Sequence, residues 1–140
     1  MMSIIDVSLD DFYRAAIAEQ LAELEQDLNQ LRAGSEAKTL TKFEYLALER
    51  TLQLLVEVAI GISKRVLKSK GLAVPTEARK SLERLKQEGL DSSNIDWRGA
   101  IGMRNALVHD YLDIDEKLVL EVLTSGKYEA VLAFCRQYLE

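Results

Sequence analysis

The sequence predicts an all-α fold, arranged as an up-and-down antiparallel helical bundle with short additional helices. Apolar residues recur at steps of three and four along nearly the whole chain, without the alternation typical of half-buried strands. One proline and seven glycines leave little room for the many turns of an all-β fold. With 140 residues, 48% of them apolar and 29% charged, the chain has the size and composition of one soluble domain spanning 1–140.

The first expected helix carries an apolar stripe over residues 9–31 that includes Phe12. The break at Gly34 should end this helix. The stripe is wider than a single neighbouring helix needs. We expect most of it to lie in the core, and a role in self-association is compatible with that placement.

A second long helix, over residues 41–70, begins with a capping box formed by Thr41 and Glu44. Four shorter helices follow, joined by short loops that make neighbouring helices mostly antiparallel. Residues 91–94 form a capping cluster before the second of these helices, and Gly126 breaks the chain before the last. The four segments are residues 75–89, 95–108, 118–123 and 128–138.

The formal net charge of −5 conceals a basic middle segment. Residues 64–104 hold 10 basic and 5 acidic side chains, whereas the segments before and after them have net charges of −6 and −4. An acidic chain is a poor general nucleic-acid binder, but a local basic segment can hold a short polyanion. Lys64, Arg65, Lys68 and Arg98 are the candidates for guiding one, with a merely solvated surface as the alternative.

The composition excludes several classes of site. Cys135 is the only cysteine and His109 the only histidine, so there is no internal disulfide, no cysteine-based zinc site and no site that needs two imidazoles from one chain. The first residues lack the basic and apolar regions of a signal peptide. The most apolar window, residues 54–62, is too short to span a bilayer and contains Glu57. We therefore expect no metal, no membrane partner and a reduced, cytoplasmic setting.

One segment, residues 98–111, is richer in polar chemistry than a helical bundle requires. In a helix, Asn105 and His109 are four residues apart and share a face, and Arg104 flanks that face. An arginine suits phosphate oxygens, and an imidazole can give or take a proton near pH 7. Such a pair suffices for metal-free cleavage of RNA if a second imidazole, water or Tyr111 supplies the other proton transfer.

A two-fold dimer with this segment at its interface would supply the second imidazole. The structural alternative is that His109 caps the end of its helix and Arg104 pairs with a carboxylate such as Asp110 or Asp113. Trp97 is a further candidate, for stacking on a base, although packing is the commoner role of a tryptophan.

Residues 104–111 are Arg-Asn-Ala-Leu-Val-His-Asp-Tyr, and they are followed by Leu-Asp-Ile-Asp. This stretch resembles the signature of HepT-like toxins of the HEPN-domain ribonuclease superfamily, which consists of an arginine, four residues, a histidine, any residue and a tyrosine. The context is also similar to that family, with Leu-Glu-Arg at residues 48–50 and Gly-Leu-Ala-Val-Pro at residues 71–75. The similarity runs over residues 41–123.

The resemblance implies an all-helical, HEPN-like homodimer whose paired motifs form a metal-independent endoribonuclease site in a cleft. On that basis Arg104 and His109 correspond to the catalytic pair and Asn105 to a supporting polar residue. Asp113 and Asp115 match the usual tail of the motif, where helix capping is the simplest role. The substrate would be an RNA, either a tRNA or an mRNA.

The resemblance also implies a partner. In type VII-like toxin–antitoxin pairs, HepT-like toxins are matched with an MntA-like minimal nucleotidyltransferase antitoxin, which transfers AMP from ATP to the motif tyrosine, here Tyr111. The ATP is used by the partner, so this chain would need no cofactor of its own. The added phosphate would repel an RNA backbone. The alternatives are a non-catalytic HEPN module that docks onto the nucleotidyltransferase and helps position its substrate, or a purely structural dimer.

Overall fold

Helices account for all the regular structure in the computed structural model, which describes residues 9–109 and 113–140. Over these residues there are six helices and no strand, so the predicted all-α class is confirmed. The helices are α1 (Asp11–Ala37), α2 (Lys42–Ser69), α3 (Ala78–Gln87), α4 (Trp97–Val108), α5 (Glu116–Thr124) and α6 (Lys127–Gln137).

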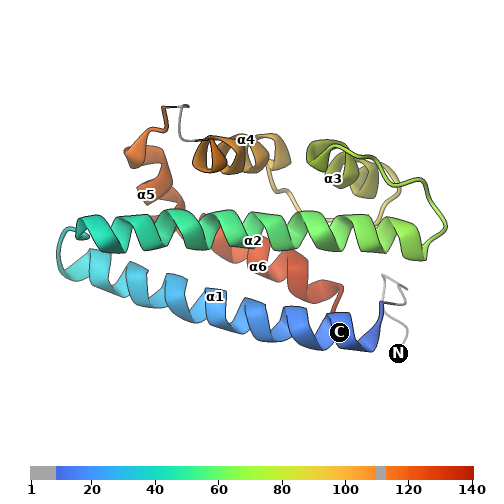
Figure 1. Cartoon of the computed structure of the whole chain (residues 1–140), viewed down its shortest axis with the longest axis horizontal. Coiled ribbons are helices and arrows are strands. Elements are labelled where there is room, and N and C mark those ends of the chain that lie inside the picture. The colour runs from blue at the N-terminus through green and yellow to red at the C-terminus, as the bar shows by residue number, and fades with distance from the viewer. Residues whose placement is uncertain (1–8, 110–112) are drawn as a thin grey trace.

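Helix α2 is the centre of the arrangement (Figure 1). α1 runs antiparallel along one side of α2, α3 and α4 lie along the other side, and α6 passes behind it. α5 and α6 pack against each other and against α1. Each helix therefore buries one apolar stripe against a neighbour, and α2 buries residues against four of them.

The ends of α2 are set by local chemistry. Thr41 Oγ1 accepts from the Glu44 N–H at 3.1 Å, and Glu44 Oε1 accepts from the Thr41 N–H at 2.8 Å, so the predicted capping box is confirmed. At the other end Gly71 has a φ of +70°, in the left-handed region that favours glycine. No helix among the described residues is both long and apolar enough to cross a membrane.

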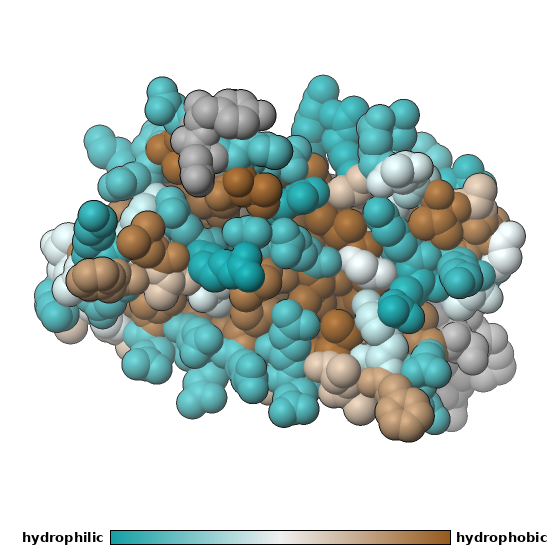
Figure 2. All heavy atoms as spheres, in the orientation of Figure 1, coloured by the Kyte–Doolittle hydropathy of each residue, from teal (hydrophilic) through white to brown (hydrophobic). Residues whose placement is uncertain are grey.

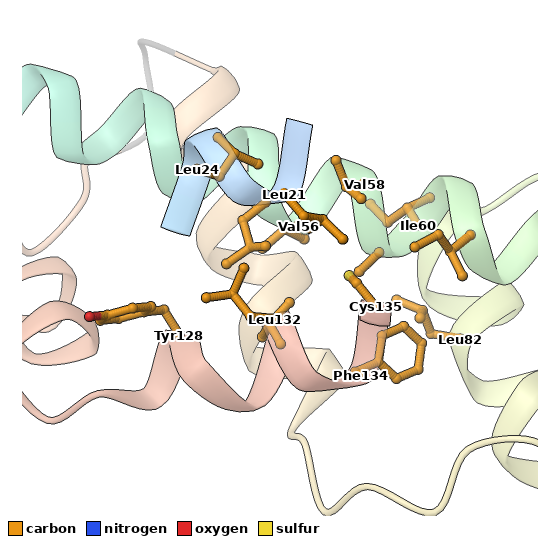
Figure 3. Close-up of a cluster of buried hydrophobic side chains, with 14 of the residues drawn as sticks. Leu21, Leu24, Val56, Val58, Ile60, Leu82, Tyr128, Leu132, Phe134 and Cys135 are labelled. Atoms are coloured by element: carbon orange, nitrogen blue, oxygen red, sulfur yellow. The ribbon is translucent and has the colours of Figure 1, made fainter. Parts of the chain in front are cut away.

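The core lies where α1, α2 and α6 meet (Figure 3). Leu24 of α1, Val56 of α2 and Leu132 of α6 are among the buried side chains that pack there. Cys135 is fully buried in the same cluster, and burial raises the pKa of its thiol to about 12. The thiol therefore stays protonated at neutral pH and packs as a small apolar group.

Leu28 of α1 is completely buried, and we expect its replacement by alanine to lower the free energy of unfolding by about 2–5 kcal/mol. The loss combines the removed apolar surface with the cavity that remains. The matched control is Leu118→Ala on α5, where the side chain is 61% exposed and little should change. Urea unfolding checks this through the transition midpoint. Equal midpoints for the two variants would contradict the burial assigned to Leu28.

Helix α1 differs from its prediction at two places. It continues through Gly34, where the Lys38 N–H donates to the Gly34 carbonyl at 3.1 Å, so the expected end is wrong. A glycine inside a helix costs only about 1 kcal/mol, and Arg32 holds this end of α1 by donating to Glu129 of α6 at 3.0 Å. Phe12, expected in the apolar stripe, is 87% exposed, and its neighbour Tyr13 packs against the core instead.

The starts of α3 and α4 also differ from the prediction. α3 begins three residues after Pro75. α4 begins at Trp97, and its cap is Asp96, whose Oδ1 accepts from the Gly99 N–H at 3.0 Å. Residues 91–94 therefore do not cap α4. Asp91, the first of them, accepts a hydrogen bond from the buried indole N–H of Trp97 instead.

Candidate functional site

A buried carboxylate holds the start of α4. Asp91 is 5% exposed, and its two oxygens accept from the indole N–H of Trp97 and the backbone N–H of Ser93, each at 2.9 Å. The Trp97 ring packs edge-on against Phe134 of α6, with the ring centroids 4.7 Å apart. Trp97 is thus a packing residue, which confirms the commoner of its two predicted roles, and its buried ring is not available for stacking on a base. The role of Asp91 was not predicted, since a carboxylate six residues before a tryptophan is no distinctive signal.

We expect Asp91→Ala to lower the free energy of unfolding by about 1–3 kcal/mol, because the buried indole N–H loses its acceptor. Asp91→Asn keeps one acceptor oxygen and should cost less. Ser92→Ala, at an exposed neighbouring position, is the control. Urea unfolding of the three variants measures the difference. If Asp91→Ala were as stable as Ser92→Ala, the indole would have another acceptor.

Helix α4 ends at Val108, where the sequence predicts, and its end presents polar side chains to solvent. Asn105 and His109 are both exposed. His109 follows the last helical residue with an extended backbone, φ −103° and ψ 102°, while its N–H still donates to the Asn105 carbonyl at 3.1 Å. The imidazole therefore lies at the rim of the helix, within reach of a solvent-borne substrate.

Arg104 is half-buried, one residue before Asn105 and three after the buried Ile101. Its Nε is shielded from solvent without a hydrogen-bond partner, and no ion pair joins its guanidinium to a carboxylate of the described residues, Asp113 included. The stem thus faces inward, whereas Asn105 faces outward.

The tail of the motif is described only in part. Tyr111 and Asp110 lie outside the described residues. Asp115 is the N-cap of α5, and its Oδ1 accepts from the Lys117 N–H at 2.9 Å, so the capping role predicted for it is confirmed. Asp113 is exposed and caps no helix among the described residues.

The basic candidates lie in different surroundings. Lys64 donates to a backbone carbonyl in the loop before α3 at 3.1 Å. The Arg65 guanidinium lies 3.8 Å from the centroid of the Tyr13 ring. Lys68 is exposed near the end of α2, and Arg98 is exposed on α4. Among the four, Arg98 is the one carried by the same helix as Arg104.

Arg98 also shares the exposed side of α4 with Asn105 and His109, because they follow it by seven and eleven residues. No ion pair joins it to a carboxylate in the described parts of the chain. By contrast, hydrophilic side chains gather over α3 on the face shown in Figure 2. Two α3 arginines are paired, one with a glutamate of the same helix and one with the glutamate at its C-cap. These pairs are Arg79–Glu83 at 3.4 Å and Arg84–Glu88 at 2.9 Å.

The fold and the end of α4 together define a helical protein in which an arginine without an ion pair among the described residues lies five residues before an exposed histidine, two side chains suited to phosphodiester chemistry. A comparison with models of protein families matches residues 17–138 to the family described as Ribonuclease HepT-like. The match covers most of the chain, which therefore belongs to the HepT-like ribonuclease family, as the resemblance at residues 104–111 predicts. No curated protein and no solved structure matches the chain.

Proposed function

We propose that this protein is an endoribonuclease toxin that cleaves RNA without a metal ion, with Arg104 and His109 as its catalytic pair. The observation that carries the proposal is the family match over residues 17–138. The chemistry at the end of α4 supports it, because a guanidinium without an ion-pair partner among the described residues lies near an exposed imidazole in sequence. Asn105 supports the site, and Arg98 helps to hold the RNA backbone.

The reaction follows from these two side chains. The His109 imidazole accepts the proton of a ribose 2′-hydroxyl, whose oxygen attacks the adjacent phosphorus. Arg104 donates hydrogen bonds to the phosphate oxygens, where negative charge grows in the transition state. The bond to the 5′-oxygen breaks, and an acid gives that oxygen a proton. The products are a 2′,3′-cyclic phosphate and a 5′-hydroxyl.

A homodimer supplies the missing acid in this scheme. Each chain has one histidine, so one imidazole can act as the base and the partner's as the acid only if two copies of α4 meet at a cleft. Their arginines would then face the same phosphate from two sides. The exposed positions of Asn105 and His109 leave this side of α4 open to such a cleft.

The direct test incubates the purified protein with labelled tRNA and mRNA in EDTA and maps the ends of the fragments. We expect cleavage that leaves 2′,3′-cyclic phosphates. Cleavage that stops in EDTA and returns with Mg²⁺ would contradict the metal-free mechanism. A protein that cuts neither RNA, yet binds an MntA-like nucleotidyltransferase tightly without ATP, would be the non-catalytic docking module instead.

Regulation is proposed to act on Tyr111 through that nucleotidyltransferase. The phenol oxygen attacks the α-phosphorus of ATP, pyrophosphate leaves, and AMP becomes attached beside the site, where its charge repels RNA. With the partner and ATP, we expect the intact mass to increase by AMP units and RNA cleavage to fall. Tyr111→Phe should lose both effects, whereas the control Tyr45→Phe should retain them. Mass increments that persist in Tyr111→Phe would place the modification elsewhere.

A further inference from the structure

An apolar groove of about 1180 Å³ lies between α4, α5 and α6, and α2 forms its floor. Leu55 of α2, Met103 of α4, Val122 of α5 and Phe134 of α6 all line it. Leu118, which also lines it, leaves 61% of its surface exposed. Four helices thus contribute apolar side chains to one open surface, which is unusual for a region that faces only water.

The polar part of the lining is strongly acidic. Its charged side chains are four carboxylates and one ammonium group: Asp96, Asp113, Asp115, Glu121 and Lys127. The single cation is already paired, since Lys127 donates to Glu121 at 3.1 Å. Asp96 and Asp115 accept backbone hydrogen bonds as helix caps. In the described parts of the chain these carboxylates form no cluster able to hold a metal ion.

The groove is distinct from the site proposed for RNA cleavage. α4 presents Met103 and Ala106 to the groove, while Arg104, Asn105 and His109 do not line it. The groove and the RNA site can then be tested separately.

We propose that this groove binds an amphipathic helix of a protein partner, with an apolar face and with lysine or arginine along its flanks. The volume is above the range of about 300–1,000 Å³ that is usual for small molecules. A helix laid between helices buries several side chains at positions i, i+3, i+4 and i+7, which suits an apolar floor. Basic flanks complement the acidic lining and oppose acidic competitors.

A second copy of this chain fits the groove less well than a basic partner. The chain has a net charge of −5, and the acidic lining would repel most of its surface. Its one strongly basic helix, α3, is packed against α2 and α4. Two of the α3 arginines are also paired, with Glu83 of the same helix at 3.4 Å and with Glu88 at its C-cap at 2.9 Å.

The test uses a fluorescein-labelled synthetic peptide of two heptads, with leucine on one face and lysine on the other, and the full-length protein. Its matched control peptide has glutamate in place of every lysine. By fluorescence polarisation we expect the lysine peptide to bind at least about tenfold more tightly, a gap of about 1.4 kcal/mol. Its affinity should fall as salt is raised. Equal binding of the two peptides would overturn the proposal.

Variants locate the binding surface. Ala133 is exposed and lines the groove. Ala133→Gln places a larger side chain there without burying a polar group, and it should lower the affinity for the lysine peptide at least about fivefold. Asp113→Asn should reduce the salt dependence. The controls, Ala22→Gln and Asp27→Asn, change exposed positions of α1 outside the groove and should have no effect. Binding by Ala133→Gln that matches Ala22→Gln would overturn the proposal.

Sedimentation of the same variants tests whether a second copy of this chain, rather than a partner helix, occupies the groove. We expect Ala133→Gln and Ala22→Gln to sediment alike. If Ala133→Gln alone were converted to a smaller species, the groove would be the seat of a second copy and the proposed partner would be wrong. RNA cleavage should be the same in both variants. The peptide-binding test can therefore fail while the ribonuclease proposal holds, and the ribonuclease proposal can fail while the peptide still binds.

Discussion

Replacing His109 with alanine is expected to slow RNA cleavage by about 10²–10⁴-fold, which is the usual contribution of a positioned acid or base. If two copies of the imidazole act in turn as base and acid, the loss lies near the upper end of that range. The imidazole is exposed, and the backbone N–H that bonds to Asn105 is kept in alanine.

The matched control for His109→Ala is Gln30→Ala, at an exposed position of α1, which should cleave RNA at the same rate as the unsubstituted protein. The measurement is single-turnover cleavage of a labelled RNA in EDTA, with urea unfolding to show equal stability of the two proteins. Cleavage by His109→Ala at the rate of Gln30→Ala would remove the imidazole from the mechanism.

Arg104→Ala is expected to lower the cleavage rate by about 10²–10³-fold, because the growing charge on the phosphate loses its donors. Its stability should change by less than about 1 kcal/mol, since the guanidinium makes no ion pair with the described residues and its shielded Nε has no partner. Arg104→Lys should restore only a small part of the rate, because an ammonium group cannot make the two parallel hydrogen bonds of a guanidinium.

The control for Arg104→Ala is Arg79→Ala on α3, which removes another half-buried arginine, one paired with Glu83 at 3.4 Å. That variant should cleave RNA normally. If Arg104→Ala cleaved normally but unfolded more easily than Arg79→Ala, Arg104 would be a structural residue only.

The helices could be predicted well because the signals that set them are local. The capping box of Thr41 and Glu44 and the cap at Asp115 depend on residues two or three apart, and the structure contains both. The end of α1 was predicted wrongly because a glycine inside a helix costs only about 1 kcal/mol, which contacts with other elements can offset. Two residues before Gly34, Arg32 bonds to Glu129, 97 residues along the chain. No local pattern carries such a contact.

In the candidate site, too, features set by local spacing could be predicted, whereas features set by contacts between distant elements could not. Spacing alone indicates that Asn105 and His109 share a side of a helix that ends near His109, and the structure places both at that exposed end. Spacing does not reveal the shielded Nε of Arg104 or the carboxylate of Asp91 under the start of α4, because both depend on what other elements bring near. The apolar groove was also missed, since its lining comes from four helices that are separate in sequence.

The anchoring of Trp97 by Asp91 and Phe134 has a mechanical consequence for the other end of α4. The 12 residues of this helix span about 18 Å at 1.5 Å each, so a tilt of about 10° about its start would move Val108 by about 3 Å. A misplacement of about 1 Å at a reacting group can cost about 10²-fold in rate. Small shape changes of the ring at position 134, which packs against the start of α4, would therefore shift the end of α4 that carries the proposed catalytic pair, and would alter the proposed cleavage without contacting RNA.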